Sequence, residues 1–218
     1  MDRRKALRNM GLAMGYTVAT PTLISIMQSC KGETVVEWTP DFFTSDQGAA
    51  ITKLVDIILP QTDTPSASEV QVHLFIDKFI NEVVDAEQQG FIKMIMGKFF
   101  DKALVSSGKG EVADLESADL ESVLAGALKI SKEQATQNEE TIADYMKSMM
   151  ENPTEGGGNL SDEVAIYTFA KNLREMTILG YKTSEYVGEE VLAYLPVPGE
   201  YIPCGDVQEL TGGKAWSL

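Results

Sequence analysis

The sequence predicts an all-α protein: a compact helical bundle with an N-terminal export signal and an irregular C-terminal tail rich in Tyr, Pro and Gly. Apolar residues recur at intervals of three and four from residue 45 to about residue 180, which is the period of a helix. No run alternates apolar and polar residues with a period of two, so we expect no sheet. With 218 residues, of which 44% are hydrophobic, the chain can fill the core of one domain.

The first two helices are separated by a polar turn. Thr44 or Ser45 can cap the first helix, and Pro60 ends it. Residues 61–65 then form a turn, and a second helix is predicted over 72–83. The predicted buried faces of these helices are Ile51, Leu54, Val55 and Ile58, then Val72, Phe75, Ile76, Phe79 and Val83.

Four more helices complete the predicted bundle. The Gly-rich run 152–159 is predicted to be an exposed loop. Ser161 opens the last helix, whose first turn is acidic as the helix dipole favours, and Gly180 is its expected C-terminal cap. The three helices before that loop are predicted over residues 91–104, 120–130 and 131–150.

Composition excludes several classes of function. A formal net charge of −15 opposes binding to nucleic acid, which requires clustered Lys and Arg. One His and two Cys cannot build a four-cysteine zinc or iron–sulfur site. No glycine-rich dinucleotide motif follows a strand. We therefore expect no four-cysteine metal site, no nucleic-acid surface and no dinucleotide site in this chain.

The N-terminus has the layout of an export signal. Residues 1–29 hold four basic residues and one acid before an apolar stretch. Arg3 and Arg4 favour a twin-arginine signal over a general secretory signal, which also starts with basic residues. Cys30 ends a run like the bacterial lipoprotein box, so it is either an acylated anchor or an unmodified Cys beside a cleavage site. The sequence thus predicts an exported, membrane-associated protein.

The predicted boundaries are a signal over 1–29, a linker over 30–44, a helical domain over 45–180 and an extended segment over 181–218. Tyr181, Tyr194 and Tyr201 give that last segment large faces suited to packing on its own bundle or on a partner. If Cys30 is lipidated, Cys204 is left either for an interchain disulfide or as a buried thiol.

Three runs resemble the gluconate 2-dehydrogenase subunit 3 family, the small subunit of bacterial flavin-dependent sugar dehydrogenases. Residues 58–65 read ILPQTDTP, similar to the family's ILPxTDTP, and are followed by Phe75, Ile76 and Asp77 where the family has FID. Residues 180–185 read GYKTSE, similar to GYYTSE. The third run is Tyr194 through Pro198, Gly199 and Tyr201 to Cys204, similar to Y…PGxYxxC.

This resemblance implies a non-catalytic, cofactor-free subunit. The expected partners are a large subunit that holds FAD and oxidises the sugar, and a cytochrome subunit with haem c. The small subunit would support folding of the large one, carry it to the periplasm, and reach the membrane by a lipid anchor or through the complex. The implied partner interface comprises Tyr181, Thr183, Ser184, Glu185, Tyr194, Pro198, Gly199 and Tyr201.

Two other classes of function remain open from the sequence. One is an envelope lipoprotein that binds a ligand or scaffolds an assembly without a dehydrogenase. The other is a hydrolase that uses His73 and Asp77, although their spacing of four residues on one helix also fits a local contact.

Overall fold

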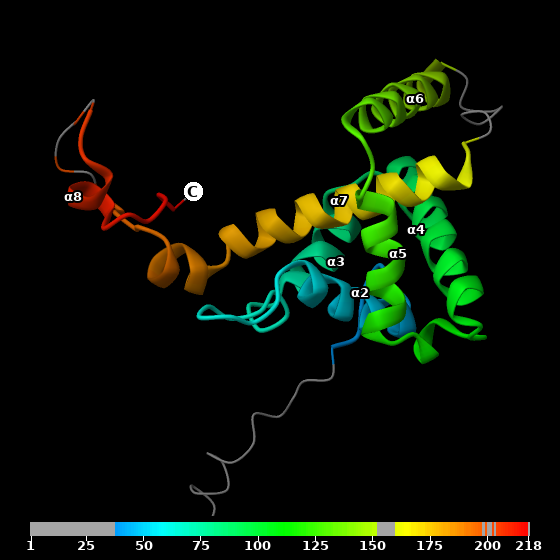
Figure 1. Ribbon diagram of the computed structural model, residues 1–218, viewed down its shortest axis with the longest axis horizontal. Helices are drawn as coiled ribbons and strands as arrows, with labels where there is room; N and C mark the ends of the chain where they lie inside the picture. The colour runs from blue at the N-terminus through cyan, green and yellow to red at the C-terminus, as the bar shows by residue number, and fades with distance from the viewer. Residues whose placement is uncertain (1–37, 152–159, 198, 200–201, 203, 218) are drawn as a thin grey trace, which may run out of the picture. The chain divides into compact units, whose positions relative to one another are not determined.

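The computed structural model describes residues 38–151, 160–197, 199, 202 and 204–217, and its folded unit runs from Pro40 to the C-terminus (Figure 1). All the regular elements in this part of the chain are helices, as predicted, and one isolated β-bridge joins two tail residues. The elements are α2 (Ser45–Ile58), α3 (Val72–Glu82), α4 (Ala86–Ser107), the 3-10 turn η1 (Val112–Asp114), α5 (Ser117–Leu128), α6 (Lys132–Glu151), α7 (Asp162–Lys182), the π-helical turn η2 (Val187–Val191) and α8 (Val207–Thr211).

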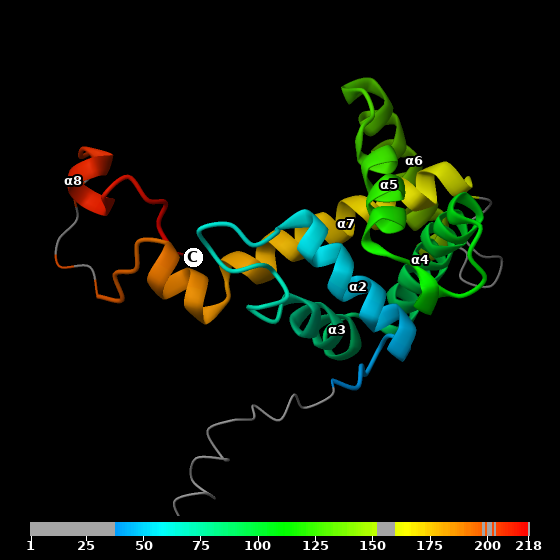
Figure 2. The same cartoon turned by 60° about the horizontal axis from the view of Figure 1, so that its bottom comes forward.

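Helix α7 is the centre of the domain. It packs against α2, α3, α4, α5 and α6. Figures 1 and 2 show α6 on one side of α7, with α2 and α3 on the opposite side. Between α4 and α7, the ring centroids of Phe99 and Phe169 lie 4.9 Å apart, and Phe100 contacts both rings. Fully burying side chains of this size contributes roughly 1.5–3 kcal/mol each. The core therefore forms where these two helices meet.

Polar side chains fix where the helices begin. Thr44 accepts a hydrogen bond from the Gln47 backbone while the Gln47 side chain accepts one from the Thr44 backbone, so α2 starts with a capping box. Asp85 caps α4 in the same way as Ser161 caps α7, by accepting from a backbone N–H in the first turn. The caps predicted at Thr44 and Ser161 are confirmed. Helix α4 begins before the predicted residue 91 because Asp85 caps it.

The folded unit begins at Pro40, within the segment expected to be a linker. Asp77 of α3 is fully buried, and its carboxylate accepts hydrogen bonds from the backbone N–H groups of Asp41, Phe42 and Phe43 at 2.8 to 3.1 Å. Phe42 and Phe43 are both buried as a result. These bonds offset the cost of burying a carboxylate and attach the start of the folded unit to α3.

Gly180 is not the C-terminal cap of α7, contrary to the prediction. The helix continues to Lys182, and the capping residue is Thr183. A Cβ atom at residue 180 would lie 2.6 Å from Cδ1 of Phe75, so the glycine is required by close packing of α7 on α3. Residue 180 is therefore a glycine because α7 packs closely on α3 there, and not because the helix ends there.

The segment after α7 contains more regular structure than an extended tail. Val187 and Gly188 of η2 are buried. The chain then runs outward and returns, because Ala193 donates to the Ala215 carbonyl at 2.8 Å and accepts from the Ser217 N–H at 2.9 Å. We call residues 194–215 the C-terminal loop. Its base is closed by these two bonds, and α8 lies within it.

Among the described residues, no helix combines the length and apolar character needed to span a membrane.

Candidate functional site

The loop between α2 and α3 is held rigidly at its ends. Asp56 of α2 accepts hydrogen bonds from both the backbone N–H and the hydroxyl of Ser68, at 2.8 and 2.6 Å. The Ala67 N–H donates to the Leu59 carbonyl, which closes the loop on the end of α2. Gln71, with φ 61°, turns the chain into α3. This loop, residues 59–71, contains most of the ILPQTDTP run, and we call it the motif loop.

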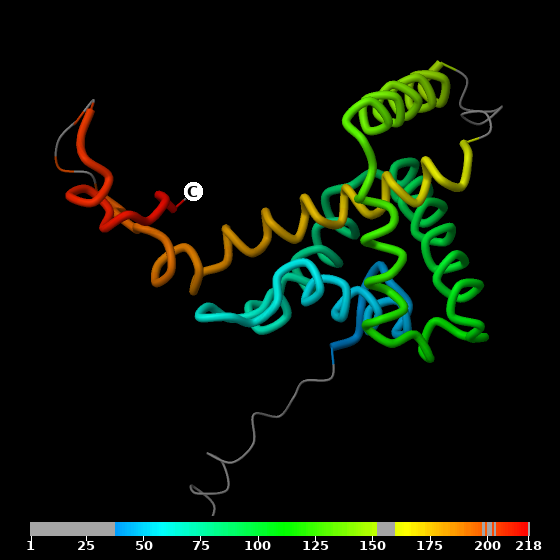
Figure 3. Tube along the Cα trace, in the orientation of Figure 1, coloured from blue at the N-terminus to red at the C-terminus, as the bar shows by residue number. Residues whose placement is uncertain are grey.

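The motif loop lies beside the end of α7, as the cyan and orange segments of Figure 3 show. The Tyr181 hydroxyl donates to the Pro65 carbonyl at 2.8 Å and lies 2.9 Å from the Thr64 hydroxyl. Two of the three runs that resemble the family, distant in sequence, are therefore in direct contact.

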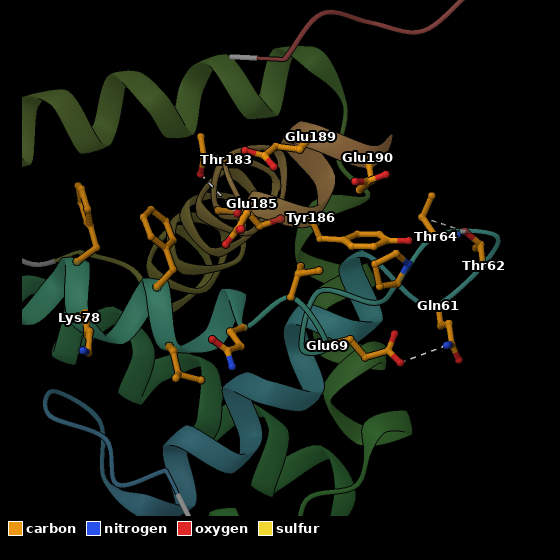
Figure 4. Close-up of a pocket in the computed structure, with 18 of the residues that line it drawn as sticks. Gln61, Thr62, Thr64, Glu69, Lys78, Thr183, Glu185, Tyr186, Glu189 and Glu190 are labelled. Carbon is orange, nitrogen blue, oxygen red and sulfur yellow. Dashed lines mark hydrogen bonds between the residues drawn. The ribbon is translucent and has the colours of Figure 1, made fainter. Parts of the chain in front are cut away.

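A groove with a volume of about 1110 Å³ lies between these two runs (Figure 4). Its apolar lining includes the partly exposed side chains of Leu74, Phe75 and Phe79 from α3. In Figure 4, Glu189 and Glu190 lie on the η2 side, while Glu69 lies on the side of the motif loop. Hydroxyl groups of Thr62, Thr64, Thr183 and Ser184 also line it.

The rim of this groove is strongly negative. Lys78 is the one basic residue among its lining residues, and it is exposed. In the described part of the chain, none of the rim carboxylates forms an ion pair with a Lys or Arg side chain. We call this feature the acidic groove; its carboxylates are Asp63, Glu69, Glu82, Glu185, Glu189 and Glu190.

A second exposed surface is apolar and belongs to the C-terminal loop. Its large side chains remain open to solvent instead of packing on the helices, and Val197 is 78% exposed. Several exposed apolar side chains on one loop make it a candidate interaction surface. The side chains concerned, together with Trp216 at the base of the loop, are Tyr194, Leu195, Val197, Ile202, Val207 and Leu210.

The sequence left one candidate pair for catalysis, His73 and Asp77, and indicated no metal site. Among the described residues, no three His, Cys, Asp or Glu side chains gather in a way that could hold a metal ion. Asp77 is fully buried and its carboxylate is occupied by three backbone N–H groups, so it is not available as a partner for a catalytic His73. The pKa of His73 is lowered by burial, against an opposing effect of the Asp56 charge. Asp77 therefore does not supply the carboxylate that the hydrolase interpretation requires.

Comparison with protein-family models gives a match over most of the chain. Residues 45–199 match the model described as gluconate 2-dehydrogenase subunit 3. The chain belongs to the gluconate 2-dehydrogenase subunit 3 family. Searches of curated proteins and of solved structures gave no match. Membership confirms the family that the sequence resembles and gives the chain the role of a subunit of a dehydrogenase complex.

The residues of this chain that were expected at the partner interface differ in burial and in hydrogen bonding. Tyr181 is half-buried and bonded to Pro65, so its hydroxyl is used within the domain. The hydroxyls of Thr183 and Ser184 donate to backbone carbonyls of α7 at 2.8 and 2.7 Å. Glu185 is exposed on the rim of the acidic groove.

The remaining expected residues lie on the C-terminal loop or outside the described residues. Tyr194 is 51% exposed, and Gly199 and Cys204 are exposed as well. Outside the described residues are Arg3, Arg4, Cys30, Pro198 and Tyr201.

Sequence reasoning did not find the carboxylates of η2 or the role of Asp77. Glu189 and Glu190 reach the acidic groove only because η2 lies beside the motif loop, a long-range contact that no local pattern indicates. Asp77 carried a signal that could have been used, since it lies next to Ile76 on the buried face of a helix. A carboxylate on such a face indicates a buried acceptor that must find donors.

Proposed function

We propose that this subunit 3 chain is a non-catalytic escort: it binds the FAD-containing large subunit of an exported sugar dehydrogenase, supports its folding and carries it through the twin-arginine pathway. The observation that carries this proposal is the C-terminal loop, which presents seven large apolar side chains to solvent when Trp216 is included. Burying such side chains in a partner is favourable, and aromatic residues are enriched at the centres of interfaces.

The lining of the acidic groove does not suit a flavin dinucleotide. A pyrophosphate group needs basic side chains or a helix N-terminus, whereas this groove presents several carboxylates and one lysine. In this proposal FAD lies in the large subunit, and haem c in a cytochrome subunit that would accept the electrons, as the family resemblance implies.

Export rests on residues outside the described part of the chain. In this proposal Arg3 and Arg4 direct the folded pair across the inner membrane to the periplasm, and Cys30 anchors it to the membrane through its acyl chains. Cys204 is exposed and can form a disulfide with the partner in an oxidising compartment.

The test is purification of the tagged full-length chain from native extract, with flavin fluorescence as the readout. We expect a flavoprotein to co-purify with the wild-type chain. The double variant Leu195→Asp and Ile202→Asp should lose it while keeping the wild-type melting temperature, because both side chains are exposed. Val105→Asp is the matched control, since Val105 is 81% exposed on α4. A wild-type chain that brings down no flavoprotein would overturn the proposal.

Two further variants separate export from binding. Replacing Arg3 and Arg4 with Lys should leave the flavoprotein in the cytoplasmic fraction while co-purification persists. Cys204→Ser should abolish a higher-mass species on non-reducing gels, and identical mobility of wild type and variant would refute the disulfide.

A further inference from the structure

We propose that the acidic groove receives a Lys- or Arg-bearing segment of the large subunit, as a second contact distinct from the C-terminal loop. This inference rests on the proposed function and names the chemistry of the surface that the groove recognises. The shape and the charge of the groove support it independently.

The apolar part of the groove suits the stem of a basic side chain. Phe75 and Phe79 of α3 are both partly exposed, and their ring centroids lie 5.7 Å apart. The methylene stems of Lys and Arg pack on such rings while the charged group reaches past them, and the ring faces also attract the cation. Tyr186, which is 53% exposed, adds a third ring (Figure 4).

The charged part of the groove suits the head group. Glu185 and Glu189 are exposed, and neither forms an ion pair or side-chain hydrogen bond within the described residues. Glu69 on the opposite side is held by the Ser66 N–H at 2.7 Å and by Gln61 at 3.2 Å. Carboxylates thus face the groove from two sides, so a cation placed between them gains from both.

Other occupants fit less well. Nucleic acid and an anionic lipid surface carry the same sign of charge as the groove and are repelled. A second copy of the chain also carries a net charge of −15. In the described residues no cluster of carboxylates is close enough to hold a metal ion. A basic segment of a protein partner is the occupant whose side-chain stems can pack on the rings while its charged groups pair with the carboxylates.

The experiment compares two charge-matched double variants in the complex purified with the large subunit. Glu185→Gln with Glu189→Gln removes two rim charges, and Glu140→Gln with Asp144→Asn removes two exposed charges from α6. We expect the groove variant to weaken binding to the large subunit about three- to tenfold at low salt, as the loss of two exposed charge pairs predicts. The difference should vanish near 1 M salt, where the Debye length is about 3 Å. The α6 variant should bind like wild type.

Zero-length carbodiimide crosslinking of the wild-type complex gives a second readout. It joins a carboxylate to a lysine amine in direct contact, so mass spectrometry should find Glu185, Glu189 or Glu69 linked to the large subunit. Wild-type affinity and salt dependence in the groove variant, or crosslinks confined to other carboxylates, would overturn the inference. If Leu195→Asp with Ile202→Asp still abolishes binding in that case, the proposed function stands without the groove. A wild-type chain that binds no large subunit would overturn both.

Discussion

The hydroxyl of Tyr181 donates a 2.8 Å hydrogen bond to the carbonyl of Pro65, which precedes it by 116 residues. The bond joins the end of α7 to the motif loop, two of the segments that line the acidic groove. It brings two short runs that are far apart in sequence into direct contact.

Removing this hydroxyl should destabilise the domain. Tyr181→Phe leaves the half-buried Pro65 carbonyl without its donor, so we expect the free energy of unfolding to fall by about 1 kcal/mol in urea titrations. Tyr186→Phe is the control, because Tyr186 is 53% exposed and should change stability by less than about 0.5 kcal/mol. Equal effects of the two substitutions would show that the bond does not contribute.

Two Gly→Ala substitutions should have opposite effects. At residue 180 the added Cβ would lie 2.6 Å from the Phe75 ring, and we expect a net loss of about 1 kcal/mol as the ring is displaced into the groove. At Gly97, inside α4, nothing lies within 4 Å of the new Cβ, so the higher helix propensity of Ala should raise stability by up to about 1 kcal/mol. Thermal unfolding of both variants measures this, and a stabilised Gly180→Ala would contradict the packing argument.

The Asp77 carboxylate should be important for the start of the domain. Asp77→Ala leaves the three backbone N–H groups at residues 41–43 without their acceptor, and we expect a loss of about 3 kcal/mol. Amide hydrogen exchange should become faster at those residues first. Asp144→Ala, at an exposed position of α6, should change neither stability nor exchange there. Unchanged protection of residues 41–43 in Asp77→Ala would refute the attachment.

Stability should fall as the pH decreases through the range where His73 titrates. Burial lowers the pKa of His73 in the folded state below its ordinary value, so below about pH 6.5 the unfolded chain binds a proton that the folded chain does not. The contribution that the neutral His73 side chain makes to the free energy of unfolding is complete above that pH and is lost as the pH falls below it. The stability advantage of wild type over His73→Gln, measured in urea at pH 8 and pH 5, should therefore be smaller at pH 5. Since this is the one His in the chain, an unchanged difference would rule out the effect.

Local patterns predicted the helices well because the caps and apolar faces that define them lie within a few residues of each other. Thr44 and Ser161 cap α2 and α7 as expected. The predicted faces of α2 and α3 supply the buried Ile51, Leu54, Val55, Val72 and Ile76, whereas Val83, expected on the same face, is 66% exposed. Gly180 was misassigned because a glycine near a helix end satisfies the local rule for a cap equally well. Its actual cause, contact with Phe75, is not visible in a local pattern.

The functional surfaces were predicted only in part for the same reason. The 180–185 run placed Glu185 among the expected interface residues, but Glu69 and Glu189 join it on the groove only through the fold of the motif loop and η2. The attachment of residues 41–43 to Asp77 spans more than thirty residues of sequence and involves backbone donors, which every residue possesses. Such contacts have no spacing rule to detect.

The two hydrogen bonds between Ala193 and residues 215 and 217 have a further consequence. They bring the ends of a long segment together during folding, so the accompanying loss of chain entropy has already occurred before any complex forms. A preorganised segment binds more tightly than a free tail of the same composition, because less freedom remains to be lost on association. In the proposed complex, the exposed apolar side chains of this segment would therefore meet the large subunit with the two ends of the segment already fixed.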